Sequence, residues 1–256
     1  MAHSRFFINL AKFALATREN VDLSDFTDVR PEDIKVISEP FPHVVVDNFF
    51  KPDVYDALCK QFNEIKALGL SNEKHGDYGR FHAFDMDYDG YVYAPAPTLD
   101  LNNQRRLFYS LEWNVFVSKL FHQFTTFETS FAFHHHPPGD KTGFVHDDFI
   151  DIHFYTTPTF PNGVIAGEKK KGTRTVARRR AISLLIYINN EEWQEGDGGE
   201  TGIYAEDKTT LLKKVPPVNN RLFAFQTSPV SMHAFQTNKK DRNCFVQWFH
   251  IPPEML

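Results

Sequence analysis

The sequence predicts a mainly β protein, a β-sandwich or jelly roll with helices packed against one of its sheets. Two observations predict this. Apolar residues recur at helical spacing mainly in the first half of the chain, whereas the second half holds short apolar runs separated by Gly- and Pro-rich turns. Helices followed by many short strands are typical of a sandwich that helices buttress. The 256 residues show no internal repeat and no clear linker, so we expect one domain over 1–256.

The first part of the chain, residues 1–125, is expected to be mostly helical. Near its start Lys12 interrupts an apolar stretch, which favours an amphipathic helix over a signal peptide. The apolar residues with helical spacing there are Phe6, Leu10 and Phe13. A second helix is expected to begin near Pro52, which suits a first helical turn. Its apolar stripe consists of Val54, Leu58, Phe62 and Ile65.

Three other segments complete this part. Residues 44–46 are three valines between turn-forming residues and are predicted to form a short strand. Residues 70–100 hold many Gly, Asp, Tyr and Pro, so we expect an ordered loop region placed to cover an active site. Helical spacing returns between about 102 and 124.

The second part, residues 126–252, is expected to form the β core. Its predicted strands are 129–136, 181–188, 199–204, 221–225, 230–235 and 243–249. A basic insertion at about 156–180 breaks the pattern, with Lys169, Lys170, Lys171, Arg174, Arg178, Arg179 and Arg180. Two interpretations stay open: a solvated hairpin, or a lid that attracts an anionic substrate or partner.

Composition excludes several classes of function. A net charge of -5 and a pI of about 6.2 argue against general nucleic-acid binding. No apolar run approaches the length of a membrane span, so we expect no membrane partner. The two cysteines, Cys59 and Cys244, lie far apart without metal-site spacing, which favours a reducing, cytoplasmic compartment. Oligomeric state is not encoded in any pattern that we recognise.

A metal site is the strongest chemical signal. His146 and Asp148 are two residues apart, and at a strand end this spacing directs both side chains to one face. His233, in the strand-like run 229–235, provides a second imidazole. Two histidines and one carboxylate form the facial triad of non-haem Fe(II) oxygenases, which leaves open positions for a co-substrate and O₂. We therefore predict that His146, Asp148 and His233 hold Fe(II).

Arg242 extends this prediction from a metal to a co-substrate. It lies nine residues after His233 on the next strand-like run, and its planar guanidinium suits a bidentate pair with a carboxylate. If Arg242 faces inward, the period of two places three further residues on the same inner face: Cys244, Val246 and Trp248.

Other polar residues have more ordinary interpretations. A second metal site at His134, His135 and His136 is disfavoured, because strand alternation sends neighbours to opposite faces. Arg180 is either solvated or a substrate contact, since it directly precedes a pocket-lining strand. Trp193 more often packs in such a position than binds a ligand.

The chain resembles the 2-oxoglutarate/Fe(II)-dependent dioxygenase superfamily, and within it the prolyl-4-hydroxylase-like branch. The resemblance covers roughly residues 40–252 and includes Trp193, His233, Arg242 and Trp248. Its local motifs are PFPHVVVDNFF at 40–50, HHPPGD at 135–140, HDD at 146–148, RAISLLIYIN at 180–189, GDGGETGIY at 196–204 and NRLFAF at 220–225.

The resemblance implies a double-stranded β-helix core, with Fe(II), 2-oxoglutarate and O₂ and with ascorbate as a candidate reductant. His146, Asp148 and His233 would be the iron ligands, and no catalytic residue is expected beyond the metal centre. Arg242, Trp248 and Tyr187 would be the co-substrate-binding residues, with Arg242 on the distal carboxylate. Two features depart from the family: the long stretch between Asp148 and Arg180, and the absence of an obvious co-substrate-binding Tyr near 133–135.

The resemblance also implies a reaction class. Such enzymes couple oxidative decarboxylation of 2-oxoglutarate, to succinate and CO₂, to hydroxylation of an unactivated C–H bond. Asp148 favours hydroxylation, because related halogenases have a small residue at that position; desaturation or cyclisation would use the same ligands. The substrate is an amino acid, small metabolite, carrier-bound intermediate or protein side chain. The alternative function is a cupin-like metal-dependent isomerase or non-oxidising binding jelly roll, which has no need of Arg242.

Overall fold

The computed structural model describes residues 22–73, 79–84, 89–94, 104–156, 164–166 and 174–255, without the side chains of 104–106 and 164–166. The helix expected around Phe6 and Phe13 and the lysines at 169–171 lie outside these residues. In the part of the chain that is described, no helix is both long enough and apolar enough to cross a bilayer.

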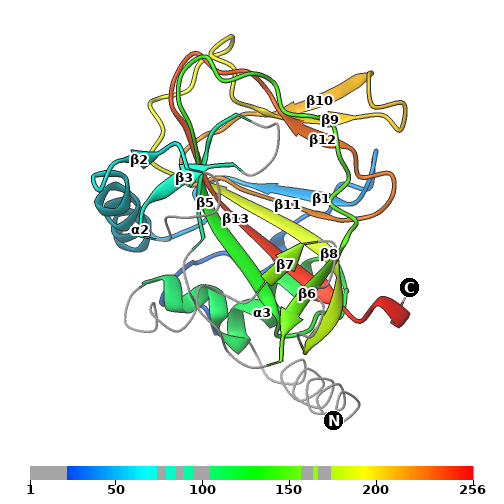
Figure 1. Cartoon of the computed structure of the whole chain (residues 1–256). Helices are drawn as coiled ribbons and strands as arrows, with labels where there is room; N and C mark the ends of the chain where they lie inside the picture. Colours follow the sequence, from blue (N-terminus) through cyan, green and yellow to red (C-terminus); the bar gives the residue numbers. More distant parts are fainter. Residues whose placement is uncertain are drawn as a thin grey trace.

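Strands dominate the described residues and form two sheets (Figure 1). The ten-stranded sheet has the order β1-β11-β8-β13-β5-β4-β3-β2, with β6 paired to β8 and β7 paired to β6. Its strands are β1 (His43–Val46), β2 (Leu70–Ser71), β3 (Phe81–Ala83), β4 (Tyr91–Tyr93), β5 (Thr129–His136), β6 (Asp151–Tyr155), β7 (Val164–Ala166), β8 (Thr175–Tyr187), β11 (Leu222–Gln226) and β13 (Arg242–Ile251). The three-stranded sheet, in the order β10-β9-β12, contains β9 (Thr201–Tyr204), β10 (Leu211–Val215) and β12 (His233–Phe235).

Within the described residues, two α-helices pack against the outer face of the large sheet, and in Figure 1 both lie away from the three-stranded sheet. They are α2 (Pro52–Lys66) and α3 (Leu111–Leu120), accompanied by the short 3-10 helices η1 (Pro31–Asp33), η3 (Gln104–Tyr109) and η4 (Pro253–Met255). The apolar stripe predicted for α2 is buried as expected, and Pro52 is at its first turn. The Phe62 ring lies 5.3 Å from Phe81 and 5.7 Å from Phe133, measured between centroids.

A second, smaller core fills the space between the two sheets. It is formed by Phe41, Leu185, Tyr187, Ile203, Val215, Phe223, Phe225, Cys244 and Val246. On β13 the even-numbered residues Cys244 and Val246 join this inner core, whereas Phe245 and Phe249 join the helix-covered core. The predicted alternation of β13 is therefore confirmed. So is the fold class, a mainly β double-stranded β-helix with helices on one sheet.

The structure adds strands where the sequence predicted other features. The loop expected over residues 70–100 contains β2, β3 and β4, which extend the large sheet next to β5 through pairs such as Tyr91↔His135. The expected basic insertion is partly strand, because β8 begins at Thr175 and pairs with β6. Apart from β8, the strands in these two regions have only two to five residues each. That is too few for a clear alternation of polar and apolar side chains.

Candidate metal centre

The three residues predicted to bind iron come together at a seam between two chain segments. An isolated β-bridge joins His146 to His233, with hydrogen bonds in both directions between their backbones at 3.0 and 2.8 Å. The Nε2 atoms of His146 and His233 lie 3.9 and 3.7 Å from the two carboxylate oxygens of Asp148. One ligand atom from each residue falls within 4.8 Å of the others. Among the described residues this is the only such group of His, Cys, Asp and Glu side chains.

Both imidazoles are oriented by the backbone. The Nδ1 atom of His146 donates to the Phe144 carbonyl at 2.9 Å, and that of His233 donates to the Ser231 carbonyl at 2.9 Å. Because a carbonyl only accepts, each Nδ1 carries the proton, and each Nε2 presents a lone pair to the site. Burial, together with the neighbouring His146, lowers the pKa of His233 to about 4, which keeps it neutral at pH 7. Neutral imidazole is the form that binds a metal.

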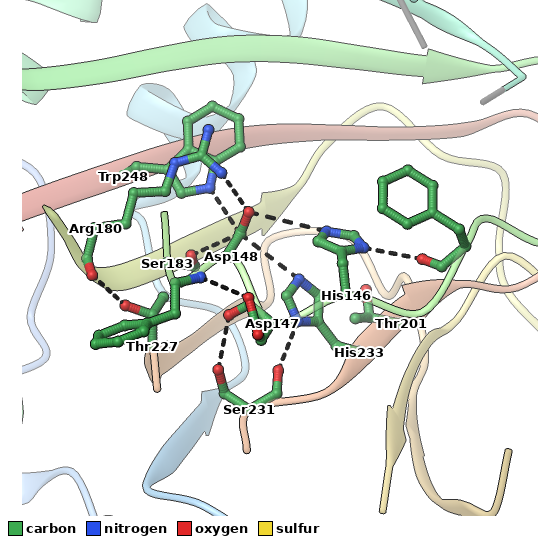
Figure 2. A network of polar contacts seen from close by, with 12 residues as sticks. His146, Asp147, Asp148, Arg180, Ser183, Thr201, Thr227, Ser231, His233 and Trp248 are labelled. Carbon is green, nitrogen blue, oxygen red and sulfur yellow. Dashed lines mark hydrogen bonds and ion pairs between the residues drawn. The ribbon is translucent and has the colours of Figure 1, made fainter. Parts of the chain in front are cut away.

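Asp148 is fixed by three donors on the side away from the histidines (Figure 2). Its Oδ2 accepts hydrogen bonds from Ser183 Oγ at 2.9 Å and Trp248 Nε1 at 2.8 Å, while its Oδ1 pairs with Arg180. Burial is the largest single influence and acts to raise the pKa of Asp148. The Arg180 guanidinium, the two histidines and the Trp248 hydrogen bond together outweigh it and hold the pKa well below the usual range. The backbone of Asp148 has φ of +60°, a left-handed conformation that Asp tolerates better than most residues. The carboxylate is thus ionised and held in one orientation.

Arg180, a predicted substrate contact, lies beside the candidate ligands. Its guanidinium carbon is 4.2 Å from the Trp248 ring centroid, and its charge is paired with Asp148. The two preceding arginines are paired as well: Arg178 with Glu128 and Arg179 with Asp151. The described end of the basic segment is therefore largely neutralised, which weakens the idea of an anion-attracting lid there.

Arg242 occupies the inner face of β13 and is 3% exposed. Its Nη2 lies 3.2 Å from Thr201 Oγ1, its Nη1 2.9 Å from Cys244 Sγ, and its Nε 3.3 Å from the Gly199 carbonyl. The Tyr187 hydroxyl is 2.7 Å from the same Thr201 oxygen. Guanidinium, phenol and threonine hydroxyl thus form one cluster of donors inside the protein, the chemistry that a carboxylate requires.

The small sheet connects this cluster to the candidate metal centre. On β12 and β9, His233 is opposite Ile203 and Phe235 is opposite Thr201, so the two sites are two residues apart along the strands. Two residues of a strand span about 7 Å. This spacing suits an extended five-carbon dicarboxylic acid, with its oxo-acid end at the metal and its distal carboxylate at Arg242.

The histidines of β5 are divided between the two faces. His135 faces the helix-covered side and its Nδ1 lies 2.7 Å from Asn243 Oδ1. His136 stacks on Phe235 at 4.0 Å between centroids, and its Nδ1 lies 3.1 Å from Asp140. Neither is part of the metal-type group, in agreement with the expected alternation. Trp193 donates to the Gly198 carbonyl at 3.0 Å, in the turn that precedes β9.

Sequence reasoning missed two residues of this region, Ser183 and Thr201. Their contacts are with Asp148 and Arg242, which are distant in the sequence. Two signals in the sequence could have identified them. Both residues lie in the motifs at 180–189 and 196–204, and Ser183 is four residues before Tyr187, which places the two side chains on the same face of a strand.

The comparisons with known proteins agree with this geometry. Residues 130–250 match the family model described as the 2OG-Fe(II) oxygenase superfamily. A prolyl-4-hydroxylase of Pseudomonas putida has a similar structure, with a TM-score of 0.56, 16% identity, and coverage of 81% of this chain and 91% of that one. A prolyl hydroxylase of Trichoplax adhaerens was solved with a peptide fragment of the hypoxia inducible factor oxygen degradation domain. Its TM-score is 0.54 and its identity 14%, and the match covers 81% of this chain and 83% of that one.

No curated protein matches the chain. At these identities the two solved structures establish the fold alone, which is that of the prolyl hydroxylases. The family model spans β5 to β13 and so contains the candidate ligands and Arg242. Residues 130–250, slightly less than half of the chain, are thus similar to the 2OG-Fe(II) oxygenase superfamily, which supports the activity of a 2-oxoglutarate-dependent dioxygenase.

Proposed function

We propose that this dioxygenase hydroxylates an unactivated C–H bond, with Fe(II) held by His146, Asp148 and His233 and 2-oxoglutarate anchored by Arg242. The observation that carries the proposal is the spacing of the two polar clusters. Their members on the small sheet, His233 and Thr201, are offset by two residues along the paired strands β12 and β9. When bound, the iron and the co-substrate supply the oxidising chemistry, with succinate and CO₂ as products.

The chain's own residues provide orientation. The carbonyls of Phe144 and Ser231 turn both Nε2 atoms toward the metal position, and the donors around Asp148 leave its carboxylate one direction in which to bind. Arg242, Thr201 and Tyr187 bind the distal carboxylate and so set the angle at which the oxo-acid end approaches the metal. Trp248 is a wall of the site that also fixes Asp148.

For the substrate we propose a side chain of a protein or peptide in preference to a free charged metabolite. Exposed apolar side chains lie within three residues of each candidate ligand in the sequence: Phe144 at 47%, Ile150 at 41% and Val230 at 37%. Exposed apolar residues around a site are typical of contact with another macromolecule. Arg180 is then a rim residue, stacked on Trp248, that contacts the substrate near the metal. Free thiols at Cys59 and Cys244 fit a reducing, cytoplasmic compartment, which we also propose.

An anaerobic titration tests the cofactor assignment. The protein is mixed with Fe(II) and 2-oxoglutarate, and the weak visible charge-transfer band of the chelate is recorded. We expect the band with wild type and its loss in His146→Ala, while His153→Ala, which changes a histidine outside the metal-type group, retains it. A band that persists in His146→Ala would refute the ligand assignment.

The substrate is tested separately under air. Candidate peptides and small molecules are incubated with enzyme, Fe(II), 2-oxoglutarate and ascorbate, and scored for succinate and for a gain of one oxygen by mass spectrometry. A peptide substrate should lose efficiency when Phe144 or Val230 is replaced by Ser. Turnover of a free metabolite that is indifferent to both replacements would exclude the macromolecular substrate.

A further inference from the structure

We propose that His134 is a co-substrate-positioning residue that donates a hydrogen bond to the oxo-acid end of 2-oxoglutarate. This inference rests on the proposed function. It assigns a role to a histidine that differs from its two neighbours on β5, and it supplies the second co-substrate contact for which the sequence offered no tyrosine.

The register of β5 places His134 between the two polar clusters. His134 is opposite Cys244 on β13, His136 is opposite Arg242, and Ser130 is opposite Trp248. The even-numbered residues of β13 face the interior, so their partners on β5 do the same. Arg242 reaches over Cys244, since its Nη1 contacts that sulfur, and Trp248 contacts Asp148. A ligand that extends from Arg242 to the metal therefore passes the His134 ring.

The surroundings of the ring are aromatic. Its centroid lies 4.8 Å from Phe84 in an edge-on arrangement, 6.2 Å from Trp248 and 6.4 Å from His136. Within the described part of the chain, neither ring nitrogen has a hydrogen-bond partner. His135 and His136 are by contrast engaged with Asn243 and Asp140. Polar atoms in a partly buried position are normally satisfied, so the His134 nitrogens are available to a ligand.

The charge state of His134 suits this role. Burial, followed by the positive charge of Arg242, lowers its pKa to about 3, so the ring is neutral at pH 7. A neutral imidazole carries one N–H donor and one acceptor. The donor can bind a carboxylate or keto oxygen, and the ring adds no charge that would compete with Arg242 for the distal carboxylate. Arg242 would thus bind the distal carboxylate of the co-substrate, and His134 would bind its oxo-acid end.

The test is the dissociation constant of 2-oxoglutarate for the Fe(II)-loaded protein, measured anaerobically by the charge-transfer band in wild type, His134→Ala and His134→Gln. We expect a rise of roughly ten- to hundred-fold in His134→Ala, which is the loss of one hydrogen bond to a charged group. His134→Gln should recover part of the affinity through its amide N–H. His135→Gln, on the same strand but facing the helices, is the matched control and should stay within about two-fold. Circular dichroism and thermal unfolding confirm that each variant is folded.

Pyruvate distinguishes the two ends, because it has the oxo-acid group without the distal carboxylate. His134→Ala should weaken pyruvate by the same factor as 2-oxoglutarate, whereas Arg242→Gln should weaken 2-oxoglutarate alone. A folded His134→Ala protein with unchanged affinity, or an effect on 2-oxoglutarate without one on pyruvate, would overturn the inference and leave the proposed function intact. Failure of wild type to form the band would overturn both.

Discussion

The two faces of the large sheet differ in composition although the same strands build them. On the outer face, Phe133 and Phe245 pack with Phe62 of α2 in a continuous apolar core. On the inner face, the intervening positions of β5 and β13 include His134, Arg242 and Trp248. One face therefore consists of the apolar core under the helices, whereas the other face carries the polar residues that we propose to bind the co-substrate. Strand alternation keeps the two roles apart within a single pair of strands.

The largest change in stability is expected from a substitution on the outer face. Phe62→Ala removes a fully buried ring and should lower the free energy of unfolding by about 3–5 kcal/mol, because the cavity is only partly refilled. Urea unfolding measures this. The dissociation constant of 2-oxoglutarate for the folded, iron-loaded variant should be unchanged; a ten-fold shift would show that the two faces are coupled.

Arg242→Gln makes the reciprocal change on the inner face. The amide keeps hydrogen-bond donors but loses the charge and the bidentate geometry. The affinity for 2-oxoglutarate should therefore fall by about 2–3 kcal/mol, or roughly 30- to 160-fold. The anaerobic titration measures the affinity. A conservative Arg242→Lys variant should retain the charge but recover only part of the affinity. Equal affinity in all three proteins would contradict the assignment of the distal carboxylate.

The stability of the protein should also depend on pH through a buried histidine that makes no contact with the candidate ligands. His250 on β13 is fully buried, and burial with the nearby Arg180 lowers its pKa to about 3, against 6.5 for an exposed histidine. Above pH 6.5 both folded and unfolded forms are neutral. Between pH 6.5 and 3 only the unfolded chain binds the proton, so stability falls as pH falls.

From pH 7 to pH 5, His250 alone should cost about 2 kcal/mol of unfolding free energy. Other buried histidines also lower the stability of the wild type as the pH falls. The quantity to measure by urea unfolding is therefore the slope of unfolding free energy against pH, compared between wild type and His250→Gln. A variant with the same slope as wild type would show that His250 is protonated in the folded protein.

The smallest expected effect concerns the orientation of Asp148. Ser183→Ala removes one of the donors on its Oδ2 and should weaken Fe(II) binding by about 1 kcal/mol, or roughly five-fold, because Trp248 and Arg180 remain. Anaerobic isothermal titration calorimetry measures the affinity of each variant for Fe(II). Ser118→Ala is the matched control: that serine is equally buried but lies on α3 and bonds Thr125. A loss of affinity in the control would point to global destabilisation.

The sequence predicted the elements whose pattern is long enough to read. Helix α2 was predicted because its buried residues have the helical spacing of its apolar residues. Strand β5 was predicted because a β-like run ends at the turn signal that begins with Pro137. The His146, Asp148, His233 group was also predictable, since two of its members are neighbours and the third lies in a recognisable strand. Arg242 was found to face inward as the period of two requires.

Other features depended on contacts that are remote in sequence. Strands β2 to β4 exist as an extension beside β5, and nothing in their two or three residues specifies that partner. The pairing of Arg180 with Asp148 was not predictable either, because Arg180 stands in a run of three arginines whose partners come from two separate segments, at Glu128 and at 148–151. A sequence shows the charges of such a run but not which of them are neutralised.

The β-bridge between His146 and His233 has a consequence for the thermodynamics of the whole fold. Its backbone hydrogen bonds set the separation of the two imidazoles, so the imidazoles have the spacing of a metal site only while the β-bridge is formed. Any ion that binds both imidazoles therefore stabilises the β-bridged form by mass action. Under the proposed iron assignment, metal binding and formation of this β-bridge are linked equilibria. Amide hydrogen exchange at His146 and His233 should then slow as the metal concentration rises.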